Sequence, residues 1–277
     1  MHSLKIVLRL TGNLFRGEFL QWRTQIALLL TLPVLYMCRM EGEEGLHVVE
    51  PFVFAWSWAF GASSLTFCLL VIQSAAPFFH RNESFIAPRA GRWPWMCARV
   101  LYLLAMSALF LLFTWLGAVL LNFDAIDWGT GALSQLGLDS VSGTSYDLTQ
   151  IPPWPCFAWT FLLNWLYISF FSLLIFALNL RISQGVGVAV AMGLCGGLNL
   201  LSSIGASVWV LNPLWFPTPH TLYLRHDLYN EGILGLPTLP ESLAYLGGLV
   251  LLLLVIIALL IPGYSFACSK NRLDDER

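Results

Sequence analysis

Two short runs of residues combine side-chain types that could do chemistry. Gly61-Ala62-Ser63-Ser64 loosely resembles a serine nucleophile site, but no histidine stands in the apolar segments to act as its base. Glu43-Glu44 near His47 could suggest metal-dependent hydrolysis. Small residues are more typical of contacts between membrane helices, and paired glutamates of a solvated loop. We expect these two roles, and no catalytic residue.

Metal and nucleotide chemistry are also not expected of this chain. His220, His226 and Asp227 could bind an ion, but their spacing matches no recognised site, and HExxH is absent. There is no GxxxxGK[ST] phosphate loop, and the only lysines are Lys5 and Lys270. The sequence therefore predicts no metal and no bound cofactor. A basic block that would bind nucleic acid is missing as well.

Composition indicates that the solvent around this chain is lipid. Of its 277 residues, 57% are hydrophobic and 11% are charged, with a mean hydropathy of +0.72. Soluble domains carry about 25% charged residues. The six cysteines form no CxxC pair and lie mostly in apolar segments, so a disulfide between Cys38 and Cys156 is not expected. The prediction is one all-α, polytopic membrane domain over residues 1–277.

Six segments are apolar enough to be transmembrane helices, which need about 20 residues each. They lie at about 24–40, 51–79, 98–122, 155–180, 185–203 and 243–264. The second segment is long, so a tilt or an extension beyond the membrane is expected.

The distribution of basic residues tests this topology. Six spans place the N-terminal segment, the 80–99 loop, the 181–184 turn and the C-terminal tail on one side. All of the 14 lysines and arginines except Arg39 and Arg225 then fall on that side. The positive-inside rule makes it the cytoplasm, so both termini are predicted to be cytoplasmic, in a multi-pass protein of a bacterial cell membrane.

The segments outside the spans are expected to differ in kind. Lys5, Arg9, Arg16 and Arg23 fall within roughly 40° on a helical wheel. Residues 1–23 therefore form either an interfacial helix, which we favour because Gly12 and Gly17 would break a long rod, or an extension of the first span. Residues 123–154 are an acidic outer segment. Residues 204–242 are too apolar for a free loop and too rich in proline for a span, which favours a re-entrant outer segment between helices five and six.

Polar residues in the spans are amides rather than charges. Gln73, Asn164, Asn179 and Asn199 either make hydrogen bonds between helices or line a substrate path. The fifth segment contains a GxxxG run from Gly193 to Gly197, which predicts close packing within one subunit or a dimer interface. The lack of buried acids or bases argues against a proton-driven transporter.

A basic loop at 80–97 follows the second segment. It runs Phe79-His80-Arg81-Asn82-Glu83-Ser84-Phe85, then Pro88-Arg89-Ala90-Gly91-Arg92-Trp93. With the amphipathic N-terminus, the six spans and the broken segment before the last span, the chain resembles the membrane subunit of an ABC transporter of the ABC-2 type. The loop departs from the commoner Glu-Arg-Glu and Gly-Thr form of that family.

The resemblance implies that this loop forms a helix that couples the permease to an ATPase. Arg81, Glu83, Phe85, Arg89 and Arg92 would then be the coupling residues. It implies an exporter of peptide, antibiotic or lipid-like cargo, two ABC ATPase subunits that hold ATP and Mg²⁺, and a second permease copy or homologue. The alternative is a polytopic protein without transport activity, such as a sensor, an assembly factor or an intramembrane enzyme.

Overall fold

The computed structural model describes residues 2–39, 44–57, 59–77, 90–129, 131, 133, 137–138, 145–146, 152–182, 184–203 and 239–262. The named elements within them are helices, apart from a two-residue antiparallel strand pair, β1 (Gly137–Leu138) and β2 (Ser145–Tyr146). The helices are α1 (His2–Phe19), α2 (Trp22–Met37), α3 (Glu50–Ser57), α4 (Ala59–Gln73), α6 (Arg92–Leu121), α7 (Pro153–Arg181), α8 (Gln184–Ser203) and α10 (Leu239–Leu260). The prediction of an all-α membrane-type protein is confirmed for this part of the chain.

Three helices are long and apolar enough to cross a bilayer, namely α6, α7 and α10. Both α6 and α7 carry prolines only in their first turn, at Pro94 and at Pro153 and Pro155. The N–H groups of a first turn have no partner inside the helix, so proline costs little there. Beyond that turn each helix continues unbroken over more than 25 residues.

The predicted second span is not one rod. Residues 50–56 and 61–73 form two helices bent by 83°, which together could make a fourth crossing. Gly61 sits at this bend, where an added Cβ would overlap the carbonyl oxygen of Ala55 and lie 3.0 Å from Cys38 Sγ. A glycine is therefore needed for α4 to approach the end of α3 so closely.

The other two predicted segments, 24–40 and 185–203, are also helical, and α8 covers the whole of the second one. The first corresponds to α2, which has 16 residues with Pro33 inside it. The fifth corresponds to α8, in which the apolar stretch is Gly185–Gly197. The loop at 80–97 is shorter than predicted, because α6 already begins at Arg92. Among the residues that the structure describes, three helices, or four if the bent pair is one span, are long and apolar enough to cross a membrane.

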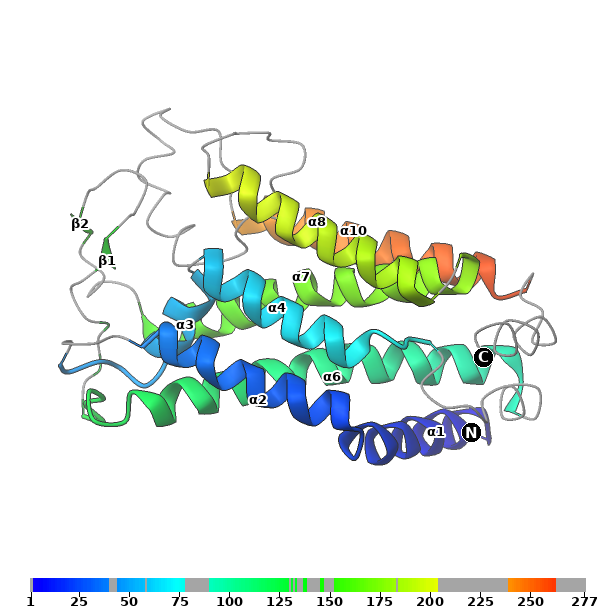
Figure 1. Cartoon of the computed structure of the whole chain (residues 1–277), viewed down its shortest axis with the longest axis horizontal. Coiled ribbons are helices and arrows are strands. Elements are labelled where there is room, and N and C mark those ends of the chain that lie inside the picture. The colour runs from blue at the N-terminus through cyan, green and yellow to red at the C-terminus, as the bar shows by residue number, and fades with distance from the viewer. Residues whose placement is uncertain are drawn as a thin grey trace.

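From α2 onwards, with α3 and α4 taken as one bent pair, the helices alternate in direction between two ends of the molecule (Figure 1). At one end, Arg39 pairs with Asp124 at 2.6 Å and Leu46 bridges to Ile126, which joins the ends of α2 and α6 to the start of α3. The other end holds the starts of α2, α6 and α8 and the ends of α4, α7 and α10. We name it the basic end, since every described lysine and arginine except Arg39 lies there: Lys5, Arg9, Arg16, Arg23, Arg92, Arg99 and Arg181.

The outer surface of α6 marks where lipid would lie. Between residues 101 and 120 its exposed side chains are all leucines: Leu101, Leu109, Leu112, Leu116 and Leu120. They span about 29 Å at 1.5 Å per residue, close to the ~30 Å hydrocarbon core of a bilayer. Exposed Trp93 lies just before this leucine band, as interfacial tryptophans do. The first turns of α6 therefore extend past the hydrocarbon at the basic end.

The N-terminal helix is separate from α2, but not for the predicted reason. Gly12 and Gly17 both lie inside α1, and the break comes at Leu20–Gln21, where Gln21 adopts an extended backbone. Contacts of α1 with α6 outweigh the helix cost of a glycine, which is about 1 kcal/mol. Thr11 Oγ1 donates to Ala98 O at 3.3 Å, and the Phe15 and Tyr102 rings are 4.9 Å apart. These pairs are one turn apart on each helix, so α1 runs alongside the start of α6.

Candidate functional site at the basic end

Most of the predicted coupling residues lie outside the described part of the chain. This applies to Arg81, Glu83, Phe85 and Arg89, whereas Arg92 is the first residue of α6. The Arg92 guanidinium donates to the carbonyl oxygen of Pro262, just beyond α10, at 2.6 Å. This hydrogen bond joins the residue that follows the loop to the end of the last described helix.

The chain that enters the loop is held by Asn179 of α7. Its Nδ2 donates to the carbonyl oxygens of Ala76 at 2.5 Å and Ser74 at 3.3 Å, directly after α4. These carbonyls follow the last turn of a helix and have no continuing helix to bond. A side chain of α7 therefore satisfies them, and the 78–89 segment is attached to the bundle on both sides.

A glycine of α8 allows this arrangement. A Cβ added at Gly187 would overlap Asn179 Oδ1 and lie 2.9 Å from the carbonyl oxygen of Ile175. Close packing within the subunit thus occurs at Gly187, which lies before the GxxxG run for which it was predicted. The Cβ positions of Gly193 and Gly197 meet no atom within 4 Å, so the GxxxG run itself faces outward.

The other predicted path residues make different kinds of hydrogen bond. Gln73 Nε2 donates to Leu103 O and Ser107 Oγ of α6, both at 3.3 Å, so it joins two helices. Asn164 is buried and its Nδ2 donates to Thr160 O within α7 at 2.9 Å. Asn199 lies on α8, and its side chain is outside the described residues. Gln73 and Asn179 thus make contacts between segments, whereas Asn164 bonds within its own helix.

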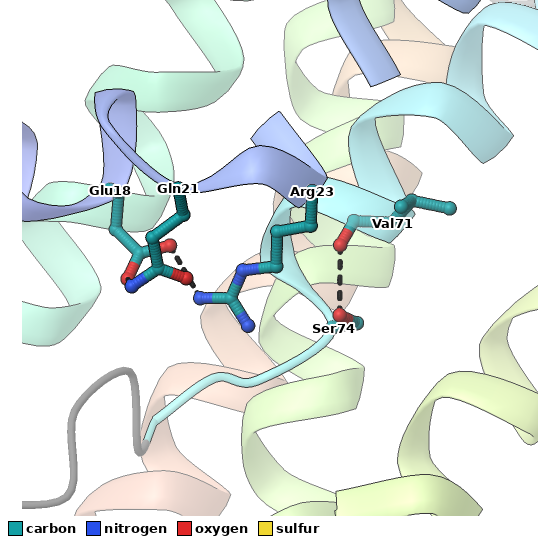
Figure 2. Close-up of polar contacts among 5 residues, drawn as sticks. All are labelled: Glu18, Gln21, Arg23, Val71 and Ser74. Carbon is teal, nitrogen blue, oxygen red and sulfur yellow. Dashed lines mark hydrogen bonds and ion pairs between the residues drawn. The ribbon is translucent and has the colours of Figure 1, made fainter. Parts of the chain in front are cut away.

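A buried ion pair lies at the turn between α1 and α2 (Figure 2). Arg23 donates to Glu18 at 2.5 Å, and Gln21 Nε2 donates to the second carboxylate oxygen at 2.8 Å. Glu18 is only 1% exposed. Arg23 therefore does not belong to the exposed basic stripe predicted for residues 1–23. That stripe consists of Lys5, Arg9 and Arg16, which are all exposed.

Two residues of α6 complete this cluster. Arg99 is buried, its guanidinium carbon lies 5.7 Å from the centre of the Trp95 ring, and its charge acts on Glu18. Tyr102 is also buried and packs its ring against Phe15 of α1. Glu18, Arg23 and Arg99 give the cluster a net charge of +1. We call these three residues and Tyr102 the junction cluster.

Burial governs the ionisation of Glu18. Loss of water raises the pKa of its carboxyl above the ordinary value, and the hydrogen bond and charge of Arg23 oppose that shift only in part. The cluster holds a carboxylate and two guanidiniums without a nucleophile positioned by a base. Its arrangement is suited to fixing α1 against α2 and α6 rather than to a reaction.

Comparison with protein-family models, curated proteins and solved structures gives no match.

Sequence reasoning missed the junction cluster. Glu18 is the only acid among the first 40 residues, and it stands five positions before Arg23. A lone acid within a basic segment is the signal that could have indicated a structural ion pair. The sequence predicts Arg99 on the loop side of its span, and it lies there. Its burial depends on the packing of α1, which no local sequence pattern reveals.

Of the motifs considered for catalysis, Ser63, Glu44 and His47 lie among the described residues, whereas Glu43, His220, His226 and Asp227 lie outside them. Ser63 is buried in α4, two residues after Gly61 at the bend. His47 and Glu50 lie at the end opposite the basic end, where burial lowers the pKa of His47 and its ring packs on Trp154. No group of three His, Cys, Asp or Glu that could hold a metal occurs among the described residues. Cys38 and Cys156 are free thiols.

Proposed function

We propose that this protein is the membrane subunit of an ATP-driven ABC exporter of the ABC-2 type. The observation that carries the proposal is the attachment of the 78–89 segment on both sides. Asn179 of α7 holds Ser74 and Ala76 before it, and Arg92 after it bonds to Pro262 beyond α10. A force applied to this segment by a soluble partner would be transmitted to α4, α6, α7 and α10 together.

Close packing explains why such a force would rearrange the helices. Protein interiors have densities near those of organic crystals, so neighbouring helices move as packed bodies rather than absorbing a displacement. In this bundle α7 packs against α8 and α10, and α4 packs against α2 and α8. ATP binding and hydrolysis would take place on two separate ATPase chains. The cargo would be a peptide, an antibiotic or a lipid-like amphipath.

The proposal includes six spans with both termini in the cytoplasm of a bacterial cell. Support comes from the alternation of α2, the α3–α4 pair, α6, α7, α8 and α10 between the two ends, and from the basic residues gathered at one of them. Single cysteines near Arg89 and near Asp139, in a cysteine-free chain, should then react with an impermeant reagent from opposite sides. Labelling of both from outside contradicts this topology.

The association with an ATPase is tested on the loop itself. Phe85 is the natural apolar anchor, and Glu83 would help to orient the loop. Truncating a residue at the centre of a desolvated interface typically costs 2 kcal/mol or more. Phe85→Ala and Glu83→Arg should therefore weaken ATPase binding in a pull-down normalised to membrane-inserted protein.

The control variants for this pull-down carry Asp139→Asn or Asp147→Asn in the 123–154 segment. They should retain the ATPase in full. If the loop variants keep the partner while the Asp139 and Asp147 variants lose it, the coupling role belongs elsewhere. If no variant and no wild-type sample binds an ATPase, the protein falls into the class of membrane proteins without transport activity.

A further inference from the structure

The surface of α1 divides into three faces. The first packs on α6 and contains Thr11, Leu14 and Glu18, which are buried. The second is an exposed apolar strip of Leu4, Leu8 and Phe19. The third is the exposed basic stripe of Lys5, Arg9 and Arg16, which stand one and two helical turns apart.

No exposed acid balances the basic stripe on α1. The helix has a single acidic residue, Glu18, and its carboxylate is turned inward to Arg23 and Gln21. Within α1 the stripe therefore presents three positive charges along one face with no exposed acid beside them. Arg92 and Arg181, which are also exposed at the basic end, lie on other helices.

The position of α1 relative to the leucine band fixes what these charges would meet. Thr11 contacts Ala98, and the leucine band of α6 begins at Leu101. Leu20 and Trp22, at the turn after α1, are 80% and 73% exposed. Since Thr11 pairs with Ala98 and Phe15 with Tyr102, Lys5 and Arg9 stand beside residues that precede the leucine band, where lipid headgroups would lie, and Arg16 stands at the edge of the band, from which a long side chain reaches back to the headgroups.

We propose that the basic stripe of α1 binds the phosphate groups of anionic phospholipids. The apolar strip would contact the first methylenes of the acyl chains, and the three cations would pair with headgroup phosphates. This surface is independent of the proposed transport function, because it requires no ATPase and no cargo. A juxtamembrane lysine or arginine adds about a fivefold preference for an anionic surface.

The test measures which lipid stays bound to the full-length chain. The protein is equilibrated in micelles with equal phosphatidylglycerol and phosphatidylcholine, exchanged into lipid-free detergent, and the retained lipid is quantified by mass spectrometry. Wild type should retain phosphatidylglycerol at least fivefold over phosphatidylcholine. Lys5→Gln/Arg9→Gln/Arg16→Gln should bring the ratio close to one, and 1 M salt should lower it, because salt screens exposed charges.

Two control variants separate the site from general charge. Lys5→Arg/Arg9→Lys/Arg16→Lys keeps the three charges and should keep the enrichment. Arg39→Gln/Arg181→Gln removes basic residues elsewhere and should also keep it. The proposal is overturned if wild type shows no preference, if the triple glutamine variant retains it, or if the Arg39/Arg181 variant loses it. Should the triple variant not fold, single Arg9→Gln must lower the ratio by itself.

Discussion

Asn179, near the end of α7, donates from its Nδ2 to the carbonyl oxygen of Ala76, which stands 103 residues earlier in the chain. The same nitrogen donates to Ser74 O, and Gly187 of α8 lies against the amide oxygen. One amide thus brings together the end of α4, α7 and α8.

Removal of the Asn179 side chain should destabilise the protein more than removal of Asn164. Asn179→Ala leaves two carbonyl oxygens without their donor, which typically costs about 1–3 kcal/mol. Asn164→Ala deletes the same atoms, but its bond to Thr160 O lies within one helix. Thermal unfolding in detergent should therefore show the larger fall in Tm for Asn179→Ala. Equal falls would mean that the Asn179 bonds do not hold the segments together.

Adding one methyl group to α8 should have opposite effects at two glycines. Gly187→Ala places a carbon on Asn179 Oδ1, and overpacking of this kind typically costs about 1–3 kcal/mol. Gly193→Ala meets open space and gains the better helix propensity of alanine. The Tm should fall for the first variant and stay equal or rise for the second. A loss at Gly193 would indicate that a further surface covers this residue.

The contribution of Glu18 to stability should depend on pH. Its pKa is raised in the folded protein, so below the ordinary carboxyl pKa, roughly 4.3, both states are protonated and burial carries no ionisation cost. Between the ordinary and the raised pKa, the carboxyl of Glu18 is ionised in the unfolded chain but still protonated in the folded protein. The free energy of unfolding therefore falls as the pH rises through this interval. Wild type should therefore lose stability relative to Glu18→Gln as the pH rises above the ordinary carboxyl pKa. An unchanged difference over this interval would show that the pKa of Glu18 is not raised.

The helices that sequence predicted well are those with long uninterrupted apolar runs. Segments 98–122, 155–180 and 243–264 correspond to α6, α7 and α10, with starts shifted by a few residues. In such runs hydropathy alone is enough to predict a helix, because a segment in lipid must satisfy all its backbone hydrogen bonds within itself. Glycine predicted helix ends less well. The helix α1 continues through Gly12 and Gly17 and ends at Phe19, where neither glycine nor proline stands.

Features that depend on tertiary contact could not be read from the chain. The bend at Gly61 arises from its approach to Ala55 and Cys38, and the burial of Arg99 arises from α1 packed over it. The sequence also does not distinguish the roles of the buried amides Gln73, Asn164 and Asn179. Only Asn179 bonds to the residues that follow α4 and lead into the loop. Which partner each amide finds is set by the fold.

The most direct measurement is the ATPase activity of this chain purified from native membranes in mild detergent, with and without its partners. The account predicts that a chain containing a phosphate loop co-purifies, that the complex hydrolyses ATP, and that the protein stripped of this partner has no activity above background. Hydrolysis by the isolated chain that survives removal of every contaminant would contradict the account. So would a protein that carries no such partner even after cross-linking in the membrane.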